Sequence, residues 1–150
     1  QVAEEAELHK CLAKLADAGL LHSARDLSDG GIAVAIAESC FASTIGVRAS
    51  MHNGVSGDSV ACSLFADSAS EVIVTCAPSS IEKIKTIADN FGFVTVVPLG
   101  ETIADRLEVS VGGRSVISEP ISNLHQTWLR GLPDALESTF HLEPSHAGEA

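Results

Sequence analysis

Two carboxylates and two glycines lie close together near the start of the chain, in the stretch Asp26-Leu27-Ser28-Asp29-Gly30-Gly31. A short apolar segment precedes this stretch and an apolar run follows it, which predicts a strand, a tight turn and the start of a helix. Such a turn places backbone N–H groups and the positive end of a helix dipole beside the carboxylates. It can hold a phosphate directly, or through a divalent cation bound to the acids.

Each polar residue of this turn has a structural and a chemical interpretation. Asp26 is at the end of the predicted strand, where side chains of α/β proteins face ligands. Asp29 is a good helix N-cap, worth ~1 kcal/mol, or a ligand for an anion-bound cation. Ser28 could cap the helix or donate a hydrogen bond to an anion. Gly30 and Gly31 are poor helix formers, so they indicate a positive φ or a close backbone approach, to a ligand or to another part of the fold.

The flanking segments predict the elements that position this turn. An apolar helical face over residues 8–18 ends at Gly19, and residues 20–27 form the short strand that leads to the turn. Residues 32–37 are apolar on every side, which predicts a helix covered on more than one face.

The rest of the chain alternates between extended and helical patterns. We expect strands over residues 45–51, 60–65, 71–76 and 93–99. Ser79 and Glu82 form the capping box of a helix over residues 80–91. Gly112-Gly113 has the spacing of a hairpin, and Pro120 can start the last helix.

These elements predict an α/β layered sandwich. The passage from Glu71 through the capped helix to Phe93 has the pattern of a βαβ unit, whereas the glycine hairpin must be antiparallel, so the sheet is mixed. No G-x-G-x-x-G follows a strand, which disfavours a dinucleotide-binding fold. We expect one domain over residues 1–136 and a disordered tail over residues 137–150.

Composition excludes several classes of function. The net charge of −11, from 20 acidic and nine basic residues, provides no basic surface for nucleic acid. No apolar run approaches the ~18 residues of a membrane span, and the acidic start excludes a secretory signal, so we expect no membrane contact and a cytoplasmic location. The four cysteines lie in apolar stretches without a Cys-x-x-Cys pair, and we expect buried free thiols at Cys11, Cys40, Cys62 and Cys76.

The remaining candidate side chains have structural interpretations. The six histidines are scattered, and we expect those in loops and on helix surfaces, among them His52 and His125, to be solvated. Trp128 follows Leu124 at helical spacing, which predicts an anchor in the core or in an interface.

Three segments resemble the phosphoribosylformylglycinamidine synthase family of the aminoimidazole ribonucleotide synthetase-related superfamily. Residues 25–40, Arg-Asp-Leu-Ser-Asp-Gly-Gly-Ile-Ala-Val-Ala-Ile-Ala-Glu-Ser-Cys, resemble its His-Asp-x-Ser-Asp-Gly-Gly-Leu-Ala-Val-Ala-Leu-Ala-Glu motif. Residues 64–72 resemble its Leu-Phe-Gly-Glu-Ser-x-Ser-Arg-Val motif, and residues 121–133 resemble its C-terminal helix. The similarity extends over residues 7–136.

The resemblance implies a C-terminal half-domain from the second repeat of the synthase, which is inactive alone. The family's ATP signature, Asp-x-x-x-x-Gly-Ala-x-Pro, is absent, since Gly-Ala occurs nowhere in the chain. The family uses ATP and magnesium to convert formylglycinamide ribonucleotide to the amidine, with ammonia released from glutamine. The implied partners are the N-terminal half-domain, the first repeat, a glutaminase domain or subunit, and the small-molecule nucleotide substrate.

The same resemblance implies the site residues. Nucleotide or phosphate contacts would come from Asp26, Ser28, Asp29, Gly30, Gly31, Asp67 and Ser68, with magnesium at Asp26. Arg25 replaces the family's His and could pair with Asp26 or with a ligand phosphate. Ala66 and Asp67 replace Gly and Glu.

Several alternatives stay open. The half-domain lines either the reacting cleft or an auxiliary nucleotide cleft of the synthase. The chain could instead be a non-catalytic phosphate-binding or interaction module of the same superfamily. It could also belong to a related ATP-using enzyme of the selenophosphate synthetase, thiamine-phosphate kinase or hydrogenase maturation type.

Overall fold

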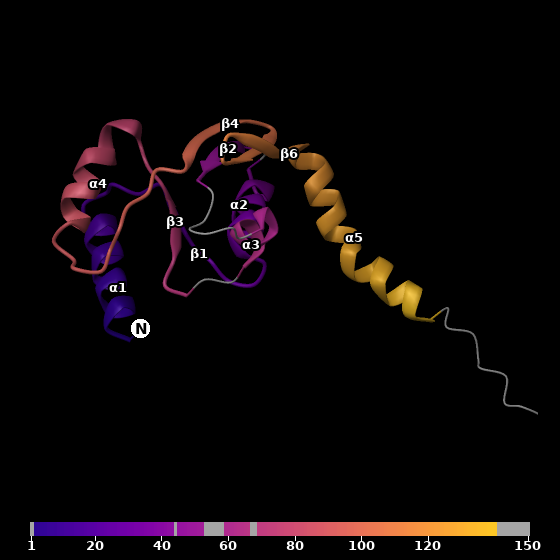
Figure 1. The fold of residues 1–150 in the computed structure, drawn as a ribbon, viewed down its shortest axis with the longest axis horizontal. Helices are drawn as coiled ribbons and strands as arrows, with labels where there is room; N and C mark the ends of the chain where they lie inside the picture. Colours follow the sequence, from indigo (N-terminus) through magenta and orange to yellow (C-terminus); the bar gives the residue numbers. More distant parts are fainter. Residues whose placement is uncertain (1, 44, 53–58, 67–68, 141–150) are drawn as a thin grey trace, which may run out of the picture.

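The computed structural model describes residues 2–43, 45–52, 59–66 and 69–140. The chain is a mixed α/β fold with a helical arm at its end (Figure 1). Its elements, in chain order, are α1 (Val2–Asp17), β1 (Ser23–Asp26), α2 (Gly31–Phe41), β2 (Ile45–Met51), α3 (Val60–Phe65), β3 (Val72–Thr75), the 3₁₀ helix η1 (Pro78–Ser80), α4 (Ile81–Ala88), β4 (Gly100–Ala104), β5 (Arg106–Val111), β6 (Arg114–Pro120) and α5 (Ile121–Phe140).

The strands form two separate sheets. The larger has the order β4-β2-β5-β6, in which β2 and β5 are parallel and the other pairs are antiparallel. The smaller is an antiparallel ribbon of β1 and β3, with Asp26 opposite Val72. The predicted mixed sheet and layered α/β class are therefore confirmed.

Helices α2 and α3 cover one face of the four-stranded sheet (Figure 1). Alternation along β5 explains this, because Leu107, Val109 and Val111 are buried while Glu108 and Ser110 belong to the opposite face. The larger core cluster joins α2, α3 and the sheet through nine buried residues: Ala33, Ile36, Cys40, Ala49, Leu64, Leu107, Val109, Val111 and Ile121.

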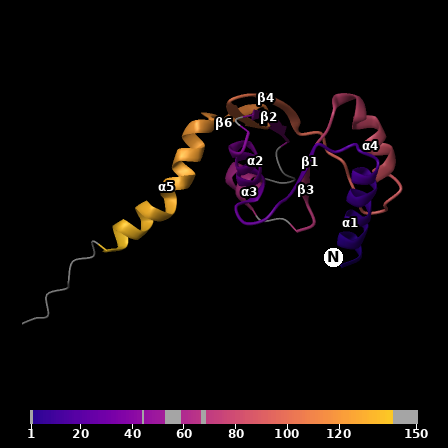
Figure 2. The same ribbon diagram turned by 180° about the vertical axis from the view of Figure 1, so that it is seen from behind.

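A smaller apolar cluster lies between α1 and α4, at the other side of the β1–β3 ribbon (Figures 1 and 2). Its buried members are Cys11, Leu15, Leu20, Ile84 and Ala88. α1 ends before Gly19, whose φ of 65° matches the predicted stop. The backbone N–H of Leu20 donates back to Leu15 O, which turns the chain toward β1.

Residues 60–65 form a helix and not the predicted strand. The Ser59 hydroxyl caps this helix by accepting from the Cys62 N–H at 3.2 Å, and Leu64 is buried under α2. A six-residue apolar run fits either a strand or a short helix. Its sequence pattern alone therefore does not distinguish the two structures.

The predicted strand over residues 93–99 and the βαβ passage are also wrong. Val94 and Val96 pack against the α1–α4 cluster without joining a sheet, and β3 pairs with β1 instead. The predicted capping box is absent, because α4 is entered through η1 and Glu82 binds the Lys85 ammonium at 2.9 Å.

Other expectations are confirmed. The β5–β6 hairpin turns at Gly112 and Gly113, whose φ values are 57° and 78°. α5 begins directly after Pro120, as predicted, and continues to Phe140, into the segment predicted as a tail; residues 141–150 of that tail lie outside the described residues. Within the described residues, no helix combines the length and apolarity needed to cross a bilayer.

Candidate functional site

The candidate turn, Asp26–Gly31, begins at the last residue of β1 and is thereby anchored to the β1–β3 ribbon. β1 covers only Ser23–Asp26 of the predicted strand over residues 20–27, and the N–H of the next residue, buried Leu27, donates to Glu71 O at 3.0 Å. Asp26 itself is exposed at the ribbon's end. The carboxylate therefore sits on a fixed backbone while its side chain stays accessible.

The turn closes within four residues. The Gly31 N–H donates to Ser28 O at 3.1 Å, and Gly30 adopts a φ of 88° as the N-cap residue of α2. No side chain caps this helix, so the structural interpretation of Asp29 as an N-cap is wrong. The positive φ of Gly30 turns the chain into the helix without a side-chain cap, and Ser28 and Asp29 remain exposed.

Gly31 is where the turn meets α3. Its φ is 66°, and a Cβ at this position would lie 2.7 Å from Ala66 O and 2.8 Å from Leu64 O. The close-approach interpretation of the glycine pair is therefore correct, with the approach to another part of the fold. Asp67 and Ser68, the other predicted site residues, lie outside the described residues, directly after Ala66.

Arg25 pairs with Glu38 and not with Asp26. Its guanidinium forms an ion pair with Glu38 of α2, and its Nε is buried without a hydrogen-bond partner among the described residues. Neighbouring strand residues point to opposite sides, so Arg25 faces away from Asp26. Sequence reasoning did not single out Glu38, although it is the first charged residue after the apolar run of α2.

An open hollow of about 460 Å³ lies on the Arg25 side, where β1, α2 and α5 meet. Its lining consists of Arg25, Glu38, Phe41, Ala42, His125 and Trp128. The Phe41 and His125 rings stack with centroids 4.8 Å apart and planes 17° from parallel. His125 is half-buried, so its predicted solvation is wrong.

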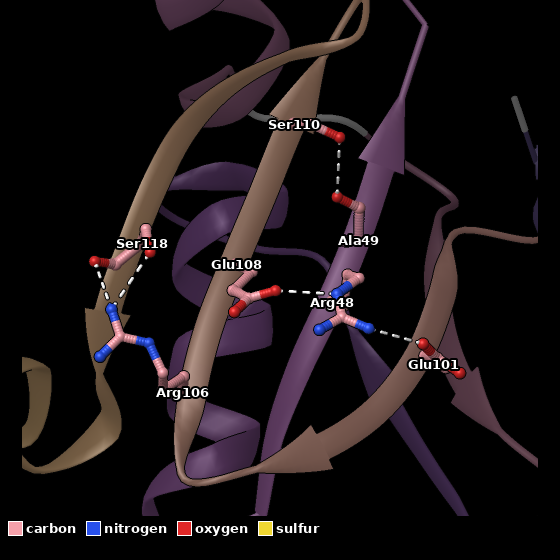
Figure 3. A network of polar contacts seen from close by, with 7 residues as sticks. All are labelled: Arg48, Ala49, Glu101, Arg106, Glu108, Ser110 and Ser118. Carbon is pink, nitrogen blue, oxygen red and sulfur yellow. Dashed lines mark hydrogen bonds and ion pairs between the residues drawn. The ribbon is translucent and has the colours of Figure 1, made fainter.

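The uncovered face of the four-stranded sheet carries a polar network (Figure 3). Arg48 binds Glu101 at 2.9 Å and Glu108 at 2.8 Å, and these two carboxylates hold the pKa of Arg48 above its ordinary value. Arg106 donates to the carbonyl and hydroxyl oxygens of Ser118. Both arginines of this network therefore already bind polar or acidic partners within the described residues.

The cysteines are the remaining groups that could do chemistry. All four thiols are free, as predicted, but only Cys11 and Cys40 are buried; Cys76 is half-buried and Cys62 is exposed. Burial raises the pKa of Cys11 and of Cys40. No group of three His, Cys, Asp or Glu side chains in the described part of the chain could hold a metal ion.

Comparison with known proteins identifies the family. The family described as "AIR synthase related protein, C-terminal domain" matches residues 1–112. The chain belongs to this family. The predicted half-domain of the aminoimidazole ribonucleotide synthetase-related superfamily is thereby confirmed.

Curated relatives of this AIR synthase-related domain are much longer than the chain. The chain is 32% identical over 159 residues to phosphoribosylformylglycinamidine synthase subunit PurL of Anaeromyxobacter dehalogenans strain 2CP-C. This alignment covers 99% of the chain and 19% of the relative. The same subunit of Thermoanaerobacter pseudethanolicus is 29% identical over 125 residues, covering 83% of the chain and 16% of the relative. The chain thus spans less than a fifth of the length of these relatives.

Solved structures show the same fold. PurLQS from Thermotoga maritima matches with a TM-score of 0.71 at 20% identity, covering 78% of this chain and 21% of that one. PurL of T. maritima complexed with ATP matches with a TM-score of 0.69 at 20% identity, covering 79% and 21%.

Proposed function

We propose that this AIR synthase-related domain forms one wall of the nucleotide cleft in a synthase that makes formylglycinamidine ribonucleotide from formylglycinamide ribonucleotide. The observation that carries the proposal is the contact of Gly31 with the end of α3, because it joins the two segments that resemble the synthase motifs. The family's N-terminal half-domain would supply the opposite wall, so we expect these 150 residues to be inactive alone.

The turn would bind a phosphate of the nucleotide or substrate through Asp26, Ser28, Asp29, Gly30 and Gly31, together with Asp67 and Ser68. Asp26 can give one carboxylate to magnesium, which binds through one or two carboxylates and otherwise through phosphates and water. When bound, magnesium would neutralise phosphate charge, and the residues of the turn would orient the phosphate.

The complete enzyme would use ATP and take ammonia from a glutaminase domain or subunit, as an amidotransferase of the carbon–nitrogen ligase class. T. maritima PurL in complex with ATP and the T. maritima PurLQS structure support these two proposals by analogy of fold. We also propose a cytoplasmic location, which the four free thiols support.

Kinetics of the complete synthase test the role of Asp26. Asp26→Asn removes a charge that would contact the phosphate or its cation, and kcat/KM for ATP-dependent amidine formation should fall about 10- to 100-fold, the loss expected for one charge-assisted hydrogen bond. The control is Asp89→Asn, at an exposed position directly after α4, which should leave the rate unchanged.

A non-catalytic module is the second candidate. The replacement of the family's His by Arg25 favours this candidate, because the site differs there from the family motif. The carboxylates of the turn are exposed, which also fits a surface that binds without catalysis. Unchanged kinetics of Asp26→Asn would support this candidate and contradict the cleft proposal.

A further inference from the structure

The two sides of the candidate turn are held unequally. α2, which follows the turn, belongs to the larger core cluster through Ala33, Ile36 and Cys40. β1, which precedes it, belongs to a two-stranded ribbon, and three of its four residues are exposed. A two-stranded ribbon is only marginally stable without further packing. The end of β1 therefore needs contacts with the rest of the domain to hold Asp26 in place.

Arg25 provides such a contact. It lies opposite Ile73 in the ribbon, which places the two side chains on the same face. Ile73 packs against the larger core cluster, so this face is turned toward the body of the domain. From this face the Arg25 guanidinium forms its ion pair with Glu38 of α2. Asp26, the next residue along the strand, is directed to the opposite side.

The Arg25–Glu38 pair is partly enclosed. The side chain of Glu38 is 21% exposed and that of Arg25 is 40% exposed. A carboxylate with so little solvent access has lost much of its hydration, so it needs a cation or hydrogen-bond donors. Arg25 Nε is buried and has no hydrogen-bond partner among the described residues. The pair therefore has fewer alternative arrangements than an ion pair on an open surface.

The position of Glu38 along α2 makes the pair effective in fixing the turn. Glu38 lies seven residues after Gly31, which is about two helical turns or ~10 Å along the helix. Gly30 and Gly31 lie between the two partners with φ values of 88° and 66°, and glycine permits a wide range of backbone conformations. A contact this far from the two glycines restricts rotation about them more than a contact at the glycines themselves.

The guanidinium of this pair is a feature of this chain. Arg25 stands where the family motif has His, whereas Glu38 matches the Glu of that motif. The substitution has therefore placed a long, permanently charged side chain opposite the carboxylate of α2.

We propose that Arg25 and Glu38 are positioning residues for the phosphate-binding turn. Their ion pair holds the end of β1 against α2 and thereby sets where the Asp26 carboxylate lies relative to the N–H groups at the start of α2. Neither side chain contacts the phosphate. The proposal deepens the proposed function and rests on it for the role of the turn as a phosphate site.

Hydrogen exchange in the complete synthase, measured by mass spectrometry over residues 26–32, tests this positioning. The Leu27 and Gly31 N–H groups report on the two ends of the turn, because they donate to Glu71 O and Ser28 O. Glu38→Gln keeps the shape of the side chain and removes its charge. We expect exchange in this peptide to become several-fold faster while exchange in β5 stays unchanged. Unchanged exchange over residues 26–32 would overturn the proposal.

Matched variants show whether the two side chains act as a pair. Arg25→Met should accelerate exchange as Glu38→Gln does, and Arg25→Lys, which keeps the cation, should retain most of the protection. The double variant should exchange no faster than the faster single variant, whereas additive effects would overturn the pairing. The control is Glu82→Gln, which removes the charge of an exposed ion pair with Lys85 on α4 and should leave the turn unchanged.

Steady-state kinetics of the complete synthase separate positioning from a loss of folded protein. A displaced turn weakens phosphate binding in the ground state and the transition state alike. Glu38→Gln should therefore raise KM for ATP or for formylglycinamide ribonucleotide about 3- to 10-fold with little change in kcat. A smaller amount of folded enzyme would lower kcat and leave both KM values unchanged, and that result would contradict a positioning role.

Asp26→Asn distinguishes failure of this proposal from failure of the proposed function. If Asp26→Asn leaves the kinetics unchanged, the proposed function fails, and the exchange measurement alone decides whether the pair fixes the turn. If Asp26→Asn lowers kcat/KM while Glu38→Gln changes neither exchange nor KM, only the positioning role fails.

Discussion

The two apolar clusters of this domain differ in what they support. The larger one holds α2, α3 and the four-stranded sheet together, and the candidate turn enters α2 directly above α3 through Gly31. The smaller one holds α1 against α4, and among the described residues its members include none from the turn. The β1–β3 ribbon connects the two regions, since β1 follows α1 and ends at Asp26.

The backbone and the side chains of the turn are held differently. The backbone of the turn is fixed by a glycine contact and by ribbon hydrogen bonds, while its polar side chains stay exposed. The larger cluster therefore determines the geometry of the candidate site. The smaller cluster stabilises the other end of the ribbon.

The largest expected effect is at the centre of the larger cluster. Leu107 is 2% exposed on β5, so Leu107→Ala should lower the free energy of unfolding by roughly 3–5 kcal/mol through lost burial and an unfilled cavity. Urea unfolding measures this change. A loss below about 1 kcal/mol, the range of most surface substitutions, would contradict the assignment of this core.

The next effect is at the contact between the turn and α3. Gly31→Ala combines an unfavourable positive φ with a Cβ that meets two backbone oxygens, so we expect a loss of about 2–4 kcal/mol in urea unfolding. Gly19→Ala is the matched control, because its φ of 65° is similar but no atom lies within 4 Å of the added Cβ. The control should lose only about 1–2 kcal/mol. Equal losses would show that the α3 contact is unimportant.

A smaller effect is expected in the α1–α4 cluster. Leu15 is 3% exposed, and Leu15→Ala should cost about 2–3 kcal/mol, since fewer buried neighbours surround the cavity. Amide exchange should accelerate in α1 and α4 and stay unchanged in α2. Acceleration throughout the domain would show that the two clusters unfold as one unit.

The smallest effect concerns pH. Burial raises the pKa of Cys40 in the folded state, so above the ordinary thiol pKa the unfolded chain binds fewer protons and stability falls as pH rises. Cys40→Ala should make this alkaline loss of stability smaller, as measured by urea unfolding at neutral and alkaline pH. The exposed Cys62 provides the control Cys62→Ala, which should retain the alkaline loss. The same slope in both variants would contradict this role of Cys40.

The sequence alone determined the features that depend on neighbouring residues. Gly19 ends α1, the Gly112-Gly113 pair forms the hairpin, β2 covers residues 45–51, and β1 lies within the strand predicted over residues 20–27. These signals are local, because a positive φ or an alternating pattern requires only a few adjacent residues. The Asp26–Gly31 motif also indicated the family correctly.

Only the tertiary structure decided the features that depend on distant partners. The run at residues 60–65 is helical where its pattern also fits a strand, and Val94 and Val96 pack on α1 and α4 without a strand partner. Arg25 binds Glu38, 13 residues away, and Gly31 approaches the backbone of α3. Trp128 is 55% exposed, although Leu124, four residues earlier on the same helix, packs against the larger core cluster. Burial and pairing depend on which elements meet in space, and local periodicity does not contain that information.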